Sequence, residues 1–347
     1  MKKDKMTNLI PDEQTLKRDE FEKNYWKDNF KKLGKDWRLY LLLLPLVFVF
    51  VCWKYMPMYE LLVAFKSGMK EGVAVIRVNE QDFVGFQWFK QMMFGSKANE
   101  FWRAFRNTFA ISFYGLLFGF PIPIIIALFF NEIKSDIYRS VLQVLTYLPK
   151  FVSTVVMTSL VALLLKVGSD VSSCGVVSTA LVKLGLLSQE AANAGVMYAP
   201  QYFRSVYIIS GIWEGCGYGS IVYFAAIIGI SPTSYEAAQM DGANKMAQIR
   251  HVVLPGILST ITIMLILRIG DLLTVGYEKI LLLYKPQTWE TADVVSTFAA
   301  RIGGLETGGS ALPGLASAAE MLSAVIAMLL VIGSNMISKR VSNTSLY

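Results

Sequence analysis

The stretch YEAAQMDGANKMAQIRHVVLP, residues 235–255, places two short polar segments and a glycine in the middle of a strongly apolar chain. The helix formers EAAQ precede Gly242, which can turn with a positive φ at no steric cost, so a first helix is expected to end there. Asn244 can cap a second short helix. This second helix should end near Leu254, because Pro255 disfavours helical geometry in the residue before it.

The residues before this stretch predict where the first helix begins. Ser231 followed by Pro232 suits an N-cap and a first helical position, while Thr233-x-x-Glu236 offers a competing capping box. Either start gives a helix-turn-helix over residues 231–255. These residues alone are also consistent with a well-capped loop that has no function of its own.

Long apolar segments lie on both sides of the helix-turn-helix. The chain has 347 residues, of which 54% are hydrophobic and 17% charged, and its mean hydropathy is +0.45, which exceeds the usual composition of a soluble domain. A bilayer core of roughly 30 Å needs about 20 apolar residues in a helix. Six segments are therefore expected to span a membrane: Leu39–Trp53 extended by Tyr55–Phe65, Thr108–Phe130, Val141–Leu165, Ser205–Ile230, Gly256–Leu283 and Leu322–Ile337.

The lysines and arginines beside the first span predict the orientation of the chain. Lys23, Lys27, Lys31, Lys32, Lys35 and Arg38 precede this span, whereas only Lys54, Lys66 and Lys70 follow it. This bias favours a cytoplasmic N-terminus, and six spans return the C-terminus to the same side. No small-residue cleavage site follows the first span, so it is expected to be an anchor rather than a signal peptide.

The domain organisation follows from these spans. We expect a charged cytoplasmic segment over residues 1–36, a six-helix membrane domain over 37–340 that contains the 231–255 loop, and a cytoplasmic tail over 341–347. The segments Lys66–Trp102 and Lys166–Arg204 are too polar to span and are expected outside.

Several functional classes are disfavoured by what the sequence contains. The net charge of +7 is spread over loops and termini rather than forming a basic face, so no nucleic acid partner is expected. The three cysteines form no CxxC motif, and the one histidine, His251, leaves no HExxH or Ser-His arrangement. No G-x-x-x-x-G-K-[ST] loop is present, so the chain is not expected to be an enzyme, and no metal, catalytic residue or cofactor of its own is expected.

Polar side chains within the fourth expected span suggest a pathway through the membrane. Gly211, Gly215 and Gly219 are spaced by four residues, which predicts a helix face for close packing. Trp213, Glu214 and Tyr218 lie nearby, and Glu214 is close to the middle of the bilayer.

Three more residues of the expected third and fifth spans join this candidate pathway. Arg268 and Asp271 are three residues apart and share one helix face, which should point into the bundle because charges facing lipid cost at least about 2.5 kcal/mol each. With Glu214 they form either a structural network or a surface that recognises sugar hydroxyls. Tyr147 is a further candidate, although a tyrosine near a span end can also be an interfacial anchor.

The 231–255 stretch resembles the EAA loop of the permease subunits of bacterial ABC importers. That motif has E-A-A, two variable residues, D-G-A, a later apolar residue and a closing L-P. Its positions are matched by Glu236, Ala237, Ala238, Asp241, Gly242, Ala243, Ile249, Leu254 and Pro255.

Other stretches are similar to the sugar-permease branch, and most of all to LplB-like or MalF-like polysaccharide and oligosaccharide permeases. They are YMPMYELLVAFK at 55–66, FWRAFRNTFAIS at 101–112, TYLPKFVSTVV at 146–156, VGYEKILLLYKPQTWETADVVSTF at 275–298 and the terminal SNTSLY. Glu60 departs from the glycine expected at its position.

The resemblance implies an all-α membrane protein with the six-helix MetI-like fold of type I ABC importer permeases. It implies a multi-pass subunit of a bacterial plasma membrane that carries oligosaccharide or polysaccharide inward. Its partners would be a second permease, two cytoplasmic ATPases that hold ATP and Mg²⁺, and a lipoprotein or periplasmic solute-binding protein. Glu236 would contact a basic residue of an ATPase. The same architecture with a peptide or phosphate ester as solute, and a passive channel or scaffold, remain alternatives.

Overall fold

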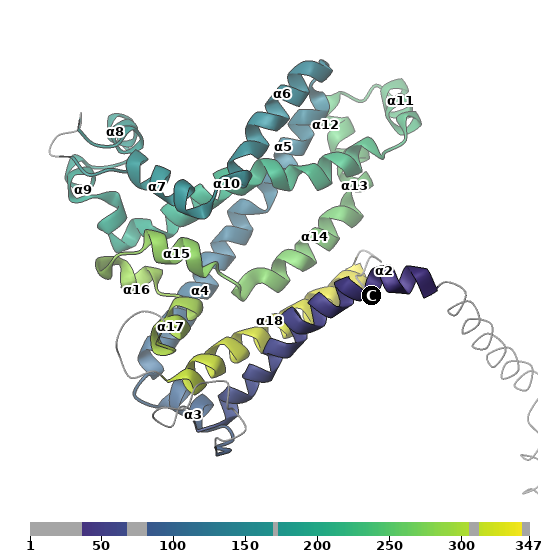
Figure 1. Ribbon diagram of the computed structural model, residues 1–347. Coiled ribbons are helices and arrows are strands. Elements are labelled where there is room, and N and C mark those ends of the chain that lie inside the picture. Colours follow the sequence, from purple (N-terminus) through teal and green to yellow (C-terminus); the bar gives the residue numbers. More distant parts are fainter. Residues whose placement is uncertain (1–36, 68–81, 169–172, 305–311, 342–347) are drawn as a thin grey trace, which may run out of the picture. The chain divides into compact units, whose positions relative to one another are not determined.

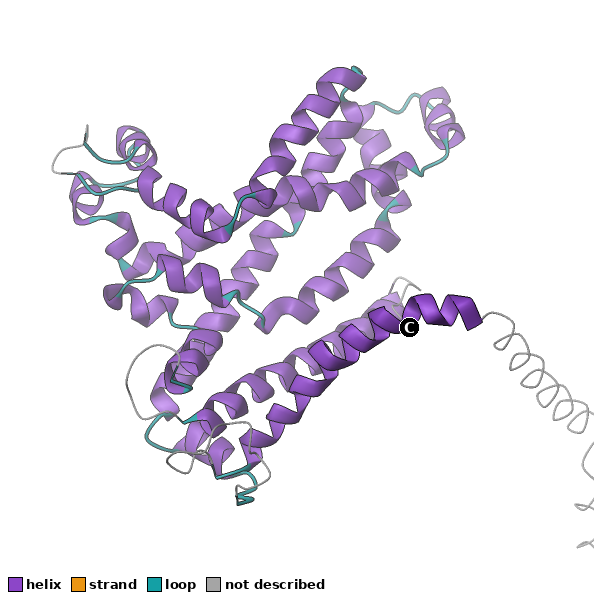
Figure 2. Ribbon diagram, in the orientation of Figure 1, coloured by secondary structure: helices purple, strands orange, loops and turns teal. Residues whose placement is uncertain are grey.

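The described part of the chain is folded into helices, as expected (Figure 1, Figure 2). The computed structural model describes residues 37–67, 82–168, 173–304 and 312–341. Over these ranges the only extended pairing is an isolated antiparallel bridge between Lys66 and Phe83. The expected segment 1–36 and the tail after Val341 lie outside the described residues. The chain forms two compact units, residues 1–62 and 63–347.

The first unit contains most of the first expected span, whose last three residues belong to the second unit. Helix α2 (Trp37–Phe50) continues through the π-helical turn η1 (Val51–Tyr55) into the 3₁₀ helix η2 (Met56–Phe65). Together Trp37–Phe65 forms a 29-residue apolar helix that is long enough to cross a bilayer. The π-helical turn lies just before Pro57, whose ring would clash with the carbonyl four residues earlier in an α-helix.

The second unit holds the remaining helices. They are α3 (Gln87–Phe94), α4 (Ala98–Gly119), α5 (Pro121–Glu132), α6 (Asp136–Tyr147), η4 (Leu148–Phe151), α7 (Thr154–Leu164), α8 (Val176–Lys183), α9 (Gln189–Ala194), η5 (Val196–Tyr198), α10 (Pro200–Ile228), α11 (Pro232–Met240), α12 (Lys245–Gln248), η6 (Ile249–Val253), α13 (Leu254–Gly256), α14 (Leu258–Gly270), η7 (Asp271–Leu273), α15 (Tyr277–Leu283), η8 (Pro286–Thr288), α16 (Trp289–Ala292), α17 (Val295–Ile302) and α18 (Pro313–Val341).

The described residues contain between four and six apolar spans. Four are single helices: Trp37–Phe65, Ala98–Glu132, Pro200–Ile228 and Pro313–Arg340. The number becomes six if two bent helix pairs, Asp136–Phe151 with Thr154–Leu164 and Lys245–Gly256 with Leu258–Leu273, are each counted as one span.

The expected third and fifth spans are not single helices. The third is bent by 101° after Phe151, where Ser153 adopts an extended conformation and its hydroxyl caps the new helix α7 at the N–H of Val156. The fifth is bent by 62° near Ile257, and it is interrupted again between η7 and α15. Hydropathy alone is insensitive to both breaks, since the residues on each side are apolar.

Helix α10 lies at the centre of the second unit. It packs against α4, α5, α6 and α16, while α18 packs against α3, α14 and α17 (Figure 1). Close approach between α10 and α6 depends on Gly217, because a Cβ there would lie 2.1 Å from the carbonyl oxygen of Thr146. Buried apolar clusters hold both ends of α10, one around Phe203 and one around Tyr223 and Ile227.

Candidate functional site

The helix-turn-helix expected over residues 231–255 is present in the structure. Helix α11 ends before Gly242, whose φ is +78°. The Oδ1 atom of Asn244 accepts a hydrogen bond of 2.9 Å from the N–H of Ala247 and caps α12. Both features were predicted from the sequence, and both set the sharp turn that connects α11 to α12.

The structure corrects two details of this element. Helix α11 begins at Pro232, but Ser231 makes no cap hydrogen bond to the backbone, and its hydroxyl lies 2.7 Å from that of Thr233. The second helix, expected to end near Leu254, continues through Pro255 and ends at Gly256. It passes through η6 into α13, with Leu254 in helical geometry and its N–H bonded to the carbonyl of Ile249. The wider π-helical turn accommodates the Pro255 ring, so the proline does not stop the helix.

Two contacts hold the element against neighbouring helices, and a third lies within its own turn. Tyr235 packs on the cluster that contains Tyr223, Ile227, Val253 and Ile257, and burial, with a smaller contribution from the charge of Glu132, raises its pKa. The Gln248 Nε2 atom donates a 2.9 Å hydrogen bond across the turn to the carbonyl of Ala243. Lys245 forms a 3.0 Å ion pair with Glu132 at the end of α5. These three contacts were not anticipated from the sequence.

The residues matched to the EAA pattern divide into an exposed and a half-buried set. Glu236, Ala237, Asp241, Gly242 and Pro255 are exposed. Ala238, Ala243, Ile249 and Leu254 are half-buried. The motif therefore exposes both of its charged side chains, while four of its apolar side chains are partly covered.

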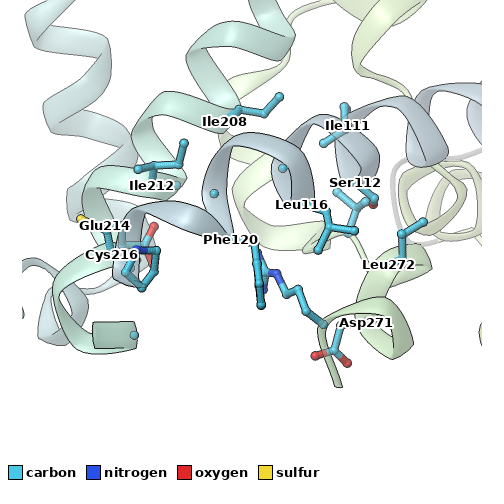
Figure 3. A pocket seen from close by; sticks show the side chains of 18 of the residues that line it. Ile111, Ser112, Leu116, Phe120, Ile208, Ile212, Glu214, Cys216, Asp271 and Leu272 are labelled. Carbon is cyan, nitrogen blue, oxygen red and sulfur yellow. The ribbon is translucent and has the colours of Figure 1, made fainter. Parts of the chain in front are cut away.

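The second feature is a cavity of about 570 Å³ on one side of α10. Its walls come from α4, α5, η4, α10, α14, η7 and α15. Figure 3 shows the side chains of Glu214 and Asp271 well apart in this pocket, with Phe120 between them. Of the six residues proposed for a pathway, Glu214, Tyr218, Arg268 and Asp271 line the cavity, whereas Tyr147 and Trp213 do not.

The charge partners of Glu214 differ from those expected. Its Oε2 atom lies 3.0 Å from the Nζ of Lys279, and its Oε1 atom lies 3.6 Å from the Nζ of Lys150. Arg268 and Asp271 line the same cavity, which agrees with the expectation that they face the bundle interior. Lys279 could not be placed from the sequence, because the break before α15 is what returns this helix to the side of α10.

The glycine pattern of α10 has the expected packing role only in part. Gly211, Gly215 and Gly219 line the cavity. A Cβ on Gly215 would meet nothing within 4 Å, whereas one on Gly217 would overlap the backbone of Thr146. The interpretation of the stripe as a packing face is therefore wrong for Gly215 but is supported at Gly219, where a Cβ would lie 3.3 Å from the Pro123 side chain. The most closely packed glycine, Gly217, is one that the four-residue pattern omits.

A buried charge cluster centred on Asp293 connects α4 to α17. The side chain of Asp293 is 1% exposed and binds Arg301 through two hydrogen bonds of 2.9 and 3.1 Å, with Arg103 at 3.2 Å. Asn107 donates hydrogen bonds to the carbonyls of Asp293 and Glu290, which joins α4 to α16. This cluster fixes the helices beside the cavity, and the sequence interpretation did not identify it. Among the described residues, no group of three or more His, Cys, Asp and Glu side chains is placed to hold a metal ion.

Comparison with known proteins shows extensive similarity. Residues 119–342 match the family described as "Binding-protein-dependent transport system inner membrane component". The chain is 31% identical over 315 residues to "Protein LplB" of Bacillus subtilis (strain 168), covering 91% of this chain and 92% of that protein. It is also 31% identical over 327 residues to "Polygalacturonan/rhamnogalacturonan transport system permease protein YteP" of the same organism, covering 94% and 95%.

A solved structure supports the fold over nearly the same range. This structure is described as "Crystal structure of bacterial alginate ABC transporter in complex with alginate pentasaccharide-bound periplasmic protein", and the matched chain is 38% identical. The TM-score is 0.75, and the match covers 91% of this chain and 99% of that chain. The family match over residues 119–342 includes the helix-turn-helix and the cavity-lining helices from α5 onward.

Proposed function

Because the chain belongs to the family of binding-protein-dependent transport system inner membrane components, we propose that it is a permease subunit of an ATP-driven carbohydrate importer. Proteins of this family are membrane components of transport systems, not enzymes. In our proposal the chain forms half of the translocation pathway, and ATP hydrolysis occurs on partner subunits that bind ATP and Mg²⁺.

The observation that carries this proposal is the helix-turn-helix between α10 and α14. Helices α12, η6 and α13 continue from one into the next without a loop and lead to α14 after a single bend. A helical connection of this kind can transmit the movement of an attached ATPase to a membrane helix, whereas a flexible loop would absorb it. We propose that the exposed side chain of Glu236 contacts the ATPase. The turn at Gly242 would keep the two short helices fixed relative to each other, so that the movement is transmitted.

Carbohydrate is the proposed solute because of the cavity and the relatives. The cavity combines the aromatic residues Tyr207, Tyr218 and Phe120 with charged groups, and sugar rings bind by stacking an apolar face on aromatics while their hydroxyls form hydrogen bonds. The relatives named for polygalacturonan or alginate transport support the same class. Tyr147 and Trp213 do not line this cavity, so we propose Tyr218, Glu214, Arg268 and Asp271 as pathway residues.

The proposed assembly and topology extend from the family. We propose six spans, in which each bent pair crosses once, and cytoplasmic N- and C-termini. The partners in this proposal are a second permease subunit, two cytoplasmic ATPases, surrounding lipid and an external lipoprotein or periplasmic solute-binding protein. The periplasmic protein named in the alginate complex supports the last of these. Alternating access follows when closure of the ATPases turns the helices that line the cavity.

Replacement of Glu236 tests the coupling role directly. Purified wild-type transporter in proteoliposomes should hydrolyse ATP faster when loaded binding protein is added and should take up labelled oligosaccharide. Glu236→Ala should lower uptake and release the ATPase during purification, while Ser234→Ala, on an exposed position of the same short helix, should leave both unchanged. Normal ATPase attachment and uptake in Glu236→Ala would contradict the assignment. Uptake of only peptides or phosphate esters would exclude carbohydrate as the solute.

A further inference from the structure

A largely enclosed lysine on the cavity wall shares one carboxylate with a second lysine. The side chain of Lys279 is 12% exposed and that of Glu214 is 17% exposed. Lys150 reaches the same carboxylate from η4, at a longer distance of 3.6 Å, and is 47% exposed. An ammonium group in so enclosed a position needs an anionic partner. Glu214 supplies this partner in the structure.

From this arrangement we propose that Lys279 and Lys150 form a binding site for a substrate carboxylate, and that Glu214 occupies this site until an acidic oligosaccharide replaces it. The inference rests on the proposed function and specifies the substrate class as oligosaccharides that contain uronic acids. Glu214 then acts as a resident competitor that keeps the lysines paired when no substrate is present.

The surroundings of the ion pair allow a ligand to reach it. Gly211 and Gly215 leave the wall of α10 without side chains next to Glu214, and a Cβ on Gly211 would already lie 3.6 Å from the Nζ of Lys279. The ring of Tyr207 lies 5.5 Å from the same Nζ and provides an apolar surface beside the charge. A sugar can therefore approach the backbone of α10 closely, with its carboxylate toward the lysines.

The charges along the cavity favour an acidic ligand over a basic one. The charged side chains that line it are the cations Lys150, Lys279 and Arg268 and the carboxylates Glu214 and Asp271. The cations exceed the carboxylates, so a ligand that carries a carboxylate balances the lining. A neutral sugar would leave the Glu214–Lys279 pair intact and would gain no ionic contact.

The site is tested with galacturonate oligosaccharides of two to six residues and their carboxyl-reduced, neutral counterparts, which differ only at the acid group. Binding to the complete reconstituted transporter without binding protein is measured by saturation-transfer NMR, and uptake is measured with binding protein present. Glu214→Gln should bind the acidic ligands more tightly, because the competing carboxylate is gone. Lys279→Gln should bind them about tenfold more weakly, the change expected for loss of a charge-assisted hydrogen bond. Neither variant should alter binding of the neutral ligands.

The opposite signs of the two effects separate this site from a structural ion pair. If Glu214 and Lys279 only stabilise the fold, both substitutions break the same contact, and both should weaken binding of acidic and neutral ligands alike. That result would overturn the inference, as would equal wild-type affinity for the acidic and neutral ligands. If the wild-type transporter takes up neutral oligosaccharides alone, the acidic class is wrong while carbohydrate import stands. Failure to take up any carbohydrate would instead refute the proposed function.

Discussion

Substitutions at Gly215 and Gly217 of α10 should separate two properties, the stability of the helix packing and transport of solute through the cavity. A Cβ on Gly215 would meet no atom within 4 Å, whereas a Cβ on Gly217 would lie 2.1 Å from the carbonyl oxygen of Thr146 and 2.5 Å from its carbon. Gly215→Ala should keep or raise the free energy of unfolding by up to about 1 kcal/mol, because alanine favours helix interiors. Gly217→Ala should lower it by about 3 kcal/mol, because the overlap involves backbone atoms.

A larger side chain at Gly215 then tests the cavity itself. Its volume of about 570 Å³ would hold on the order of twenty waters at ~30 Å³ each, and Gly215→Phe adds seven carbon atoms to its wall. Uptake by proteoliposomes should fall at least about tenfold, which corresponds to about 1.4 kcal/mol on the limiting step. Thermal unfolding and the subunit content of the purified complex should match those of Gly215→Ala.

Three results would refute this reasoning. Unchanged uptake by Gly215→Phe would show that the solute does not pass through the cavity. Loss of the partner permease from the purified Gly215→Phe complex would assign this face of α10 to contact between subunits. Wild-type thermal stability of Gly217→Ala would show that the close approach of α10 and α6 is not required.

Three further tests concern other parts of the chain. Gly242→Asn should preserve coupling of ATP hydrolysis to uptake, whereas Gly242→Val should impair it. Asn tolerates a positive φ, and no atom lies within 4 Å of a Cβ at this position. Equal coupling in both variants would contradict the need for this turn. In a protein that carries Cys52→Ser and Cys174→Ser, a water-soluble methanethiosulfonate reagent should modify Cys216, which lines the cavity. Bound substrate should slow this modification. A modification rate unaffected by substrate would count against a pathway through the cavity. Asp293→Asn should lower the free energy of unfolding by about 3–5 kcal/mol, because it removes the carboxylate shared by two arginines. Denaturant or thermal unfolding measures this change. A loss below about 1 kcal/mol, as for an exposed ion pair, would contradict the structural role of the cluster.

The helix-turn-helix was predictable because its signals are local. Gly242 and Asn244 each act through their own backbone or a hydrogen bond three residues away, and such interactions depend little on the rest of the fold. The effect of Pro255 was not predictable in the same way. Proline restricts the residue before it, but a π-helical turn offers a second solution, and nothing in the sequence distinguishes a stopped helix from a widened one.

The cavity was predictable in part. Hydropathy located Glu214, Arg268 and Asp271 within apolar segments, and the cost of charges in lipid correctly placed them on the cavity side. Their partners depend on tertiary structure. Lys279 is 65 residues from Glu214, and it reaches the cavity only because the fifth segment breaks before α15. Spacing also could not show that Gly217, rather than its neighbours, touches Thr146, because that contact depends on where α6 crosses α10.

The π-helical turn η6 has a consequence for how this region can change during evolution. A π-helical turn contains one residue more than the α-helix it replaces, so deletion of any one residue from Ile249–Val253 would convert it to regular α-helix. Because the wider turn and the α-helical turn that it replaces rotate the chain by nearly the same angle, the helices on either side would keep their facing. The Pro255 ring, however, would then clash with the carbonyl four residues before it. The extra residue and the proline therefore depend on each other, and a one-residue gap in this segment should appear among related permeases only where the proline is also replaced.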